Sequence, residues 1–417
     1  MKQLVINGGY ELNGTIPVSG AKNSAVALIP ASLLSDEIVT IDNIPNISDI
    51  EALNEILEYL GAKVERTGES ITIDASHIAN KEIPREISSK LRASYYFMSA
   101  LLGKYKKVDM YFPGGCSIGA RPIDQTLKAF RALGATVEEV DNHFSIRAEK
   151  LVGTEIYLDM ASVGATVNTI LASVKAEGKT IINNAAKEPE IVNVATFLNN
   201  MGAKIEGAGT SSIIIEGVNS LRGCFHEVIP DRIEAGTFVI LGALLGKNLR
   251  IDGLIPMHIQ ALLTKLQNMG ADMQILDDAI IINKGPLTGI SIKTLGYPGF
   301  ATDLQQPFTT LLTQCEGESI VEETIYENRF QNIPYLMDMG AHIEVVHNQK
   351  IKITGKTNLH GAKVKATDLR AGACMILAGL VADGTTYIEN VEHVLRGYEN
   401  IVEKLTSIGA KIELKEI

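Results

Sequence analysis

The stretch YLGAKVE (residues 59–65) recurs along the chain as ALGATVE (132–138), NMGAKIE (200–206), NMGADMQ (268–274), DMGAHIE (338–344) and SIGAKIE (407–413). The glycines of successive copies are 73, 68, 68, 70 and 69 residues apart. A period this even predicts a fold built from six similar units.

Each copy marks the expected end of a helix and the start of strands. The segments before the glycine place apolar residues at helical spacing, and glycine is the usual residue just past a helix C-terminus. Alternating runs such as residues 63–75 follow and predict hairpin strands. A second helix in each unit, such as residues 22–35 or 231–246, is apolar nearly all round, which predicts an interior helix. The unit is therefore strand, buried helix, strand, surface helix, strand, strand.

The chain ends indicate how the repeats are divided between domains. The sixth copy stops at KIELKEI (411–417), one strand short, while the first 20 residues contain strands with no helix before them. An N-terminal strand that completes the sixth repeat brings the termini together. We therefore predict two α/β domains of three repeats each, residues 21–229 and residues 1–20 plus 230–417. A single domain is less favoured, because six buried helices would have to share one core.

Composition excludes several classes of protein. The 417 residues include 38 Lys and Arg against 49 Asp and Glu, a net charge of −11, which disfavours a general nucleic-acid partner. No apolar run approaches the ~20 residues that span a bilayer, and the N-terminus lacks the apolar core of a signal peptide. The four cysteines are scattered without zinc spacing. We expect a cytoplasmic protein with no membrane partner and no metal; the oligomeric state stays open.

Polar and charged residues interrupt the apolar pattern at the expected helix starts. At buried helices these are Lys22, Asn23, Arg92, Ser162, Val163, Gly164, Asp231, Arg232, Asp303, Asp368 and Arg370. At surface helices they are Arg121, Asp124, Glu188, Glu190, Arg329 and Arg396. Helix N-termini already carry partial positive charge and attract anions, so Lys and Arg there add more positive charge than the helix itself needs. Salt-bridged capping explains any one of them, but the repetition favours a cleft between two domains that binds more than one anionic group.

Two positions carry reactive side chains. Cys116 lies in FPGGCSIGARP (112–122), where Arg121 and a following helix start favour the thiolate. That environment suits an acid–base or nucleophilic role, whereas Cys224, Cys315 and Cys374 fit inert apolar positions. Asp303 is either a helix N-cap or a base facing the cleft. Signatures of nucleoside-triphosphate, dinucleotide and zinc-protease sites are missing.

Ten segments of the chain together resemble the enolpyruvyl transferases that act on UDP-N-acetylglucosamine. They are SGAKNSA (19–25), LRAS (91–94), PGGCSIGARPID (113–124), SVGATVN (162–168), EPEIV (188–192), PDRIEAGTF (230–238), TDLQ (302–305), ENRF (327–330), TDLRAG (367–372) and RGYE (396–399). The resemblance covers essentially the whole chain in order. It implies two inside-out α/β domains with the active site in the cleft between them.

The resemblance also implies an activity. Members of the family transfer the enolpyruvyl group of phosphoenolpyruvate to the 3′-hydroxyl of UDP-N-acetylglucosamine and release phosphate, without a cofactor. This is the first committed step of peptidoglycan synthesis, and the enzymes are the target of fosfomycin. Two alternatives remain: 5-enolpyruvylshikimate-3-phosphate synthase, which lacks the PGGC loop, and a non-catalytic repeat scaffold such as a nucleic-acid clamp.

Roles for individual residues follow from the same resemblance. Cys116 matches the general acid, which fosfomycin alkylates, and Asp303 matches the base for the sugar hydroxyl. Lys22, Arg121 and Arg396 match the residues that hold the phosphate, with Asn23 beside them. Arg329 and Arg370 match positions near the enolpyruvyl carboxylate. The expected contacts to the UDP-sugar come from Arg92, Arg121, Pro122, Ile123, Asp124, Gln125, Ser162, Val163, Gly164, Asp303 and Ile325.

Overall fold

The computed structural model describes residues 2–112 and 123–416, which form two compact units. Unit I comprises residues 20–112 and 123–229. Unit II comprises residues 2–19 and 230–416. The chain therefore passes from one unit to the other at residues 19–20 and again at residues 229–230.

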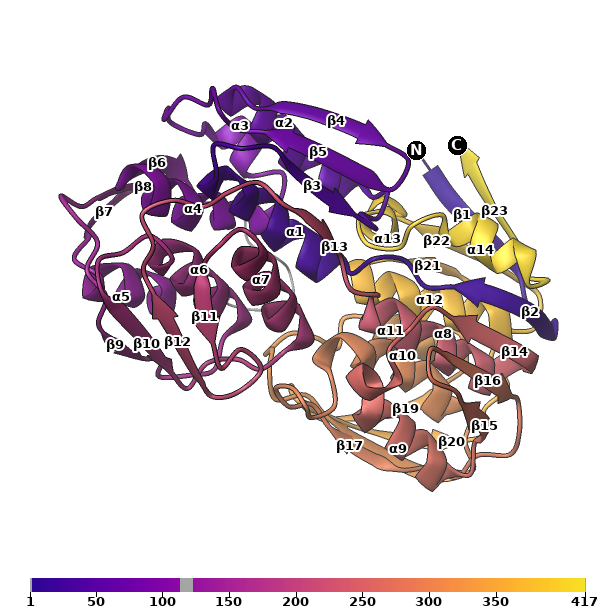
Figure 1. Ribbon diagram of the computed structural model, residues 1–417. Helices are drawn as coiled ribbons and strands as arrows, with labels where there is room; N and C mark the ends of the chain where they lie inside the picture. Colours follow the sequence, from indigo (N-terminus) through magenta and orange to yellow (C-terminus); the bar gives the residue numbers. More distant parts are fainter. Residues whose placement is uncertain (1, 113–122, 417) are drawn as a thin grey trace. The chain divides into compact units, whose positions relative to one another are not determined.

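Unit I contains three small sheets among its described residues, with strand orders β13-β3-β5-β4, β6-β8-β7 and β11-β12-β10-β9 (Figure 1). Its strands are β3 (Val39–Asp42), β4 (Lys63–Thr67), β5 (Ser70–Asp74), β6 (Lys107–Tyr111), β7 (Thr136–Val140), β8 (His143–Arg147), β9 (Glu155–Tyr157), β10 (Lys179–Asn183), β11 (Lys204–Glu206), β12 (Ser212–Glu216) and β13 (Phe225–Glu227).

Unit II repeats this arrangement in its described part, with sheets β15-β16-β14-β2, β17-β18-β20-β19 and β21-β22-β1-β23. Its strands are β1 (Lys2–Asn7), β2 (Leu12–Pro17), β14 (Gly246–Asp252), β15 (Asp272–Ile275), β16 (Ala279–Asn283), β17 (Ser291–Lys293), β18 (Gly317–Glu322), β19 (His342–His347), β20 (Lys350–Gly355), β21 (Lys363–Lys365), β22 (Thr385–Glu389) and β23 (Lys411–Glu416).

Strands β2 and β13 each pair with a strand of one unit, although the helix that follows each of them in the chain belongs to the other unit. Strand β2 precedes the first helix of unit I but pairs in parallel with β14 of unit II. Strand β13 precedes the first helix after residue 230 but pairs in parallel with β3 of unit I. This exchange explains why the chain crosses between the units twice.

The two ends of the chain meet in one sheet of unit II. Strand β1 lies between β22 and β23 and is antiparallel to both, with Leu4 opposite Ile388 on one side and Leu414 on the other. The labels N and C in Figure 1 mark these neighbouring strands. Strand β1 thus supplies the strand that the sixth repeat lacks.

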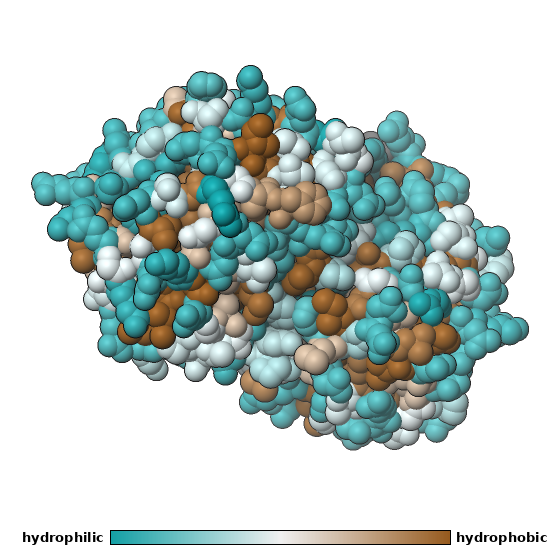
Figure 2. Space-filling model, in the orientation of Figure 1, coloured by the Kyte–Doolittle hydropathy of each residue, from teal (hydrophilic) through white to brown (hydrophobic). Residues whose placement is uncertain are grey.

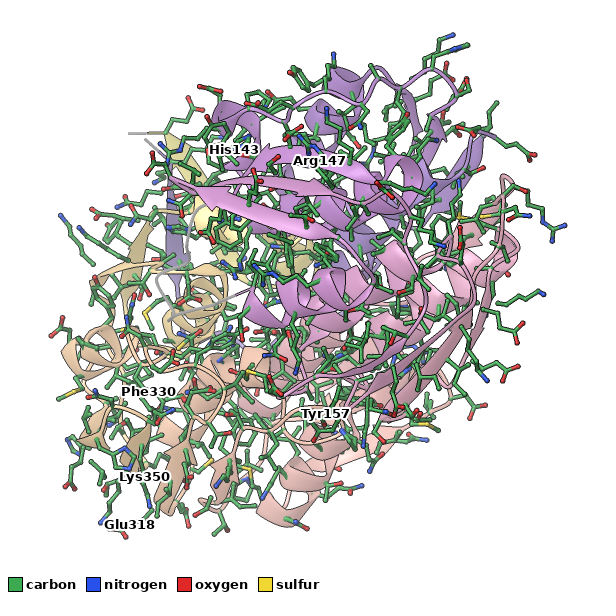
Figure 3. The ribbon with its side chains drawn as sticks, turned by 90° about the vertical axis from the view of Figure 1, so that its left-hand side faces the viewer. His143, Arg147, Tyr157, Glu318, Phe330 and Lys350 are labelled. Carbon is green, nitrogen blue, oxygen red and sulfur yellow. The ribbon has the colours of Figure 1, made fainter. Side chains whose placement is uncertain are left out.

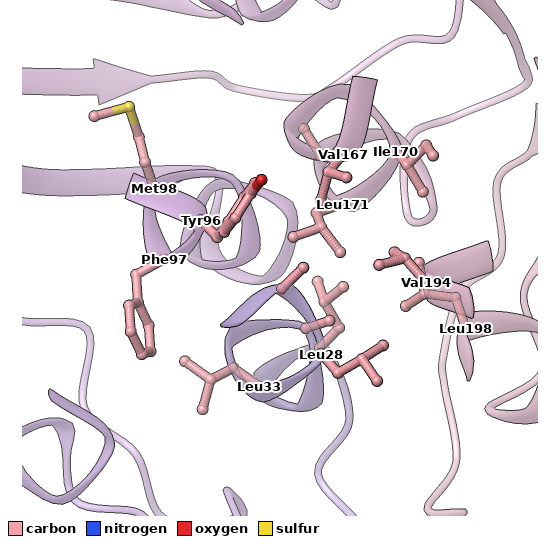
Figure 4. Packing of buried hydrophobic residues seen from close by; sticks show 14 of the residues in the cluster. Leu28, Leu33, Tyr96, Phe97, Met98, Val167, Ile170, Leu171, Val194 and Leu198 are labelled. Atoms are coloured by element: carbon pink, nitrogen blue, oxygen red, sulfur yellow. The ribbon is translucent and has the colours of Figure 1, made fainter. Parts of the chain in front are cut away.

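Each unit is built around three apolar helices. In unit I they are α1 (Lys22–Ala31), α4 (Tyr96–Tyr105) and α6 (Val163–Ser173); in unit II they are α8 (Arg232–Leu245), α10 (Thr302–Thr313) and α12 (Leu369–Val381). Figure 4 shows side chains of α1, α4 and α6 meeting in the core of unit I. A Cβ on Gly103 would lie 2.7 Å from the carbonyl oxygen of Leu171, so α4 and α6 touch through backbone there. The prediction of interior helices is confirmed.

The surface helices end where the repeated glycine predicts. They are α2 (Ser48–Leu60), α5 (Asp124–Ala132), α7 (Pro189–Asn200), α9 (Gln260–Met269), α11 (Ile333–Asp338) and α14 (Ile401–Ser407). The glycine of each copy has φ between +92° and +104°, the left-handed conformation that a residue with a Cβ rarely adopts. Shorter helical turns are η1 (Ser32–Leu34), α3 (Arg85–Ser88), η2 (Arg92–Tyr95), η3 (Pro256–Ile259) and α13 (Glu392–Leu395).

The expected α/β fold class is confirmed, with many small sheets wrapped around apolar helices. The face shown in Figure 2 is mostly hydrophilic, with apolar residues in small groups. Among the described residues, no helix is long and apolar enough to cross a membrane.

Candidate active site

The three buried helices of unit II begin with acidic residues, but these residues act in two different ways. Asp231 caps α8 by accepting hydrogen bonds from the backbone of Ile233 (2.8 Å) and Glu234 (3.0 Å). Asp368 caps α12 in the same way. Helix α10 has Ala301 as its N-cap, and Asp303 lies inside its first turn. The interpretation of Asp303 as an N-cap is therefore wrong.

The carboxylate of Asp303 is held by two arginines. Arg329 donates to one oxygen at 2.7 Å, and Arg370 donates to the other at 3.3 Å. Both arginine side chains are 4% exposed, whereas the Asp303 side chain is 26% exposed. Burial opposes ionisation, but the guanidinium charges outweigh it and hold the pKa of Asp303 well below its usual range. Asp303 is thus an ionised carboxylate whose basicity is suppressed by its partners.

Arg370 is also fixed from its other side. It donates to the hydroxyl of Tyr398 at 3.2 Å and lies 5.5 Å from the centre of that ring. Burial alone would lower the pKa of Arg370, but Tyr398 and Asp303 raise it, so the guanidinium stays charged. The Tyr398 hydroxyl also bonds Thr237 at 2.9 Å, and burial raises its pKa. Tyr398 was not predicted as a site residue, although it lies in the RGYE segment (396–399).

Two arginines lie elsewhere than expected. Arg329 precedes α11 by four residues, and Arg396 is the C-cap residue of the short helix α13. The prediction that both lie at the starts of surface helices is wrong. Asn400, the N-cap residue of α14, adopts a positive φ of 47°, so α14 does not continue from α13 and Arg396 lies between the two helices.

In unit I the buried helices begin with cationic or neutral residues. Lys22 is the first residue of α1, with half-buried Asn23 beside it. The Lys22 ammonium lies 2.6 Å from Asp49, and the two side chains are 13% and 4% exposed. The sequence analysis did not single out Asp49, which lies in the first turn of α2. This buried partner fixes the position of the Lys22 charge.

The starts of η2 and α6 lie next to each other. Arg92 opens η2, which packs on α1, and its guanidinium lies 5.3 Å from the ring centre of Phe112. Ser162 caps α6 by accepting from the backbone of Ala165 at 3.2 Å, and Val163 is the first helical residue. A Cβ on Gly164 would lie 1.7 Å from the Tyr95 hydroxyl oxygen. Only glycine permits this contact between η2 and α6.

The start of α5 joins the same region of unit I. Ile123 is its N-cap residue, and Asp124 opens the helix. The Gln125 side chain donates to Asp124 (2.8 Å) and Asp159 (3.1 Å) and accepts from the backbone of Asp159 (2.8 Å). Asp159 lies three residues before Ser162, so this amide connects α5 to the start of α6.

The predicted site residues thus fall into two groups. Unit I holds Lys22, Asn23, Arg92, Ile123, Asp124, Gln125, Ser162, Val163 and Gly164, and unit II holds Asp303, Ile325, Arg329, Arg370 and Arg396. Cys116, Arg121 and Pro122 lie outside the described residues. The other cysteines are free thiols, and burial raises the pKa of Cys224 to about 11 and of Cys315 and Cys374 to about 12.

Comparison with known proteins identifies the class. The family model for EPSP synthase (3-phosphoshikimate 1-carboxyvinyltransferase) matches residues 6–405. The chain belongs to this family of enolpyruvyl transferases. It is 53% identical to UDP-N-acetylglucosamine 1-carboxyvinyltransferase 2 of Bacillus cereus over 414 residues, covering 99% of this chain and 96% of the relative. It is 51% identical to UDP-N-acetylglucosamine 1-carboxyvinyltransferase 1 of Streptococcus agalactiae, covering 100% of both chains.

Solved structures agree with this assignment. The enolpyruvyl transferase NikO from Streptomyces tendae is similar with a TM-score of 0.90 and 28% identity, covering 99% of both chains. The EPSP synthase from Acinetobacter baumannii has a TM-score of 0.74 and 20% identity, covering 100% of both chains. The second similarity shows a shared fold.

Proposed function

We propose that this chain is a UDP-N-acetylglucosamine 1-carboxyvinyltransferase. It transfers the enolpyruvyl group of phosphoenolpyruvate to the 3′-hydroxyl of UDP-N-acetylglucosamine and releases phosphate. The observation that carries the proposal is 53% identity, over 99% of the chain, to relatives with this name. EPSP synthase shares the fold, but the solved examples are only 20% identical to this chain. We take units I and II to be the two three-repeat domains of the enzyme.

Unit I contributes most of the residues that we propose to bind anionic groups, and Arg396 of unit II joins them. Lys22 and Asn23 open α1, and together with Arg121 and Arg396 they hold the phosphate of phosphoenolpyruvate in this proposal. Arg92, residues 121–125 and residues 162–164 bind the UDP-sugar. A fixed ammonium such as Lys22, held by Asp49, can neutralise a departing phosphate without reorganising.

Unit II contributes the base. Asp303 accepts the proton of the 3′-hydroxyl, with Ile325 contacting the sugar nucleotide and Arg329 and Arg370 facing the carboxylate of the enolpyruvyl group. Because both arginines hold Asp303 in the structure, its basicity rises once a substrate anion draws one guanidinium away. The base is therefore activated when the site is filled.

Cys116 supplies the proton in this scheme. Its thiol protonates C3 of phosphoenolpyruvate, which builds positive charge at C2, and the 3′-oxygen attacks C2 as Asp303 takes the hydroxyl proton. A proton then returns from C3 to the Cys116 thiolate as phosphate departs, which restores the double bond and the thiol. Each step uses side chains alone, so we propose no cofactor. Both substrates are small molecules. Cys224, Cys315 and Cys374 are free thiols, which fits the cytoplasmic location that we propose.

Phosphate release tests the proposed activity. Purified protein is mixed with phosphoenolpyruvate alone, with UDP-N-acetylglucosamine, or with shikimate 3-phosphate. We expect phosphate only with UDP-N-acetylglucosamine. Release with shikimate 3-phosphate instead would show that the chain is an EPSP synthase.

Thiol labelling tests the acid. After brief treatment with fosfomycin and UDP-N-acetylglucosamine, we expect one adduct on Cys116, because the raised pKa values of Cys224, Cys315 and Cys374 keep their thiols protonated. Peptide mapping by mass spectrometry locates the adduct. Labelling of another cysteine, or normal turnover by Cys116→Ala, would contradict the assignment.

A further inference from the structure

A buried glutamate outside the predicted site organises the surroundings of Asp303. Glu323 directly follows β18, and it is 1% exposed. Its neighbour Glu322 points to the other face of the strand, where it pairs with Lys293 at 2.9 Å. Figure 3 labels Glu318 of β18 and Lys350, which lies opposite Glu322 in the neighbouring strand β20, with Phe330 above them in this view. Glu323 is thus on the interior side of the chain.

Four donors converge on the Glu323 carboxylate. One oxygen accepts from the Thr294 hydroxyl (2.8 Å) and from the backbone N–H groups of Ile325 (2.8 Å) and Tyr326 (3.3 Å). The other oxygen accepts from the Thr302 hydroxyl at 2.9 Å. The carboxylate therefore ties together β17, the segment after β18 and the first residue of α10.

The bond to Thr302 determines how that hydroxyl meets Arg329. Arg329 donates to the Thr302 oxygen at 2.7 Å, and a guanidinium can only donate. The single hydroxyl proton must then point elsewhere, and the Glu323 oxygen receives it. Glu323 thereby fixes the rotation of the hydroxyl so that its lone pair faces Arg329, whose other nitrogen holds Asp303.

We propose that Glu323 is a positioning residue for the transfer reaction. One of its oxygens, through Thr302, orients Arg329 on Asp303. The other fixes the backbone of Ile325, the expected contact to the sugar nucleotide. The contact with Thr302 and the contact with the backbone of Ile325 are the two arms of Glu323, and we expect separate effects when each arm is disturbed. This inference rests on the proposed function for its kinetic readout.

The test compares four single variants, and the double variant Glu323→Gln/Thr302→Val, with the wild type. Glu323→Gln converts one acceptor oxygen to a donor, which breaks one arm, and removes the negative charge, which weakens the hydrogen bonds of the other arm. Thr302→Val removes the hydroxyl at nearly constant shape, so it disturbs only the arm to Arg329. Thr302→Ser keeps the hydroxyl, and Glu322→Gln is the matched control on the opposite face of the strand.

We expect Thr302→Val to lower kcat about tenfold or more with little change in the KM for UDP-N-acetylglucosamine, since small displacements in an active site are costly. Glu323→Gln should lower kcat similarly and also raise that KM several-fold. Thr302→Ser and Glu322→Gln should stay within about twofold of wild type. The double variant Glu323→Gln/Thr302→Val should have a kcat no lower than that of Glu323→Gln, because both changes break the same chain of contacts from Glu323 through Thr302 to Arg329.

Wild-type turnover separates this inference from the proposed function. If the wild type turns over, normal kinetics in Glu323→Gln and Thr302→Val, or multiplying losses in the double variant, overturn the positioning role. If the wild type releases no phosphate, the proposed function fails. Urea denaturation then tests whether Glu323, Thr302 and Arg329 form one chain of contacts. A midpoint shift in the double variant smaller than the sum of the single shifts supports the chain, and additive shifts overturn it.

Discussion

The buried helices of the two units begin with opposite chemistry. Helices α1, α4 and α6 of unit I, each described in full, have no acidic residue in their first turns. Helices α8, α10 and α12 of unit II begin with Asp231, Asp303 and Asp368. One repeated architecture therefore carries two different electrostatic designs.

In the proposed function, this difference gives the helix starts of the two units different tasks. A helix N-terminus without an acid keeps its partial positive charge, which favours a bound anion by about 0.3–1 kcal/mol. In unit II, Asp231 and Asp368 satisfy the helix ends, while Asp303 remains available to Arg329 and Arg370. The starts of the buried helices in unit I are thus suited to holding anionic groups, and the start of α10 in unit II is suited to transferring a proton.

The largest expected effect comes from removing the base in unit II. Asp303→Asn keeps the shape of the side chain but removes its charge and its ability to take a proton. We expect turnover to fall by about 10² or more, the usual scale for a general base. UDP-sugar binding should stay within about tenfold, roughly 1.4 kcal/mol. Steady-state kinetics and calorimetry measure the two quantities, and near-normal turnover would contradict the division of work.

In unit I the largest effect should come from Lys22. Lys22→Ala removes the ammonium that opens α1, and losing one charged hydrogen bond costs about 1.5–3 kcal/mol. We expect the KM for phosphoenolpyruvate to rise at least about tenfold, with a smaller change for UDP-N-acetylglucosamine. Asp49→Asn keeps the ammonium but loosens it, so its effect should have the same direction and be smaller. Equal effects on both substrates would mean that Lys22 shapes unit I without holding the phosphate.

Periodicity predicted the fold well because every repeat obeys the same local rules. The six glycines all adopt positive φ, and the apolar helices are interior. The expected boundaries at residues 20 and 229 already group β2 with unit II and β13 with unit I, but the parallel pairing of β2 with β14 and of β13 with β3 could not be predicted, because pairing between strands distant in sequence leaves no local signal. The interior position of β1 in its sheet has the same origin.

The candidate site was predictable where a charged residue breaks an apolar pattern, as Lys22, Asp303 and Arg370 do. Excluding the capping role of Asp303 required the position of Ala301 as the N-cap of α10, and its role as a base stays a prediction. Asp49, Tyr398 and Glu323 were missed because each acts through a contact made across many residues of sequence. Motifs reveal the residues at a helix start but not the side chains that hold them.

Arg396 tests whether anion binding is confined to unit I. It lies in unit II, between α13 and α14, yet we propose that it contacts the phosphate. Arg396→Ala should raise the KM for phosphoenolpyruvate about tenfold, the lower end of the cost of a lost charged hydrogen bond. Kinetics with each substrate varied in turn measure this effect. A larger rise for the UDP-sugar would assign Arg396 to the other substrate.

The smallest effect concerns how stability depends on pH. Arg329 and Arg370 hold the folded-state pKa of Asp303 below its unfolded value, so the carboxylate stabilises the fold above the unfolded pKa of about 3.9. That contribution is lost as the pH falls toward the folded pKa, because the unfolded chain takes up the proton first. Asp303→Asn has no proton to gain at this position, so wild type should be more stable at pH 7 by an amount that stays constant down to about pH 5. Between pH 5 and pH 3 this advantage should shrink by about 1 kcal/mol in urea unfolding experiments. A constant difference down to pH 3 would mean that the two arginines do not hold Asp303 ionised, and the contrast between the units would lose its basis in unit II.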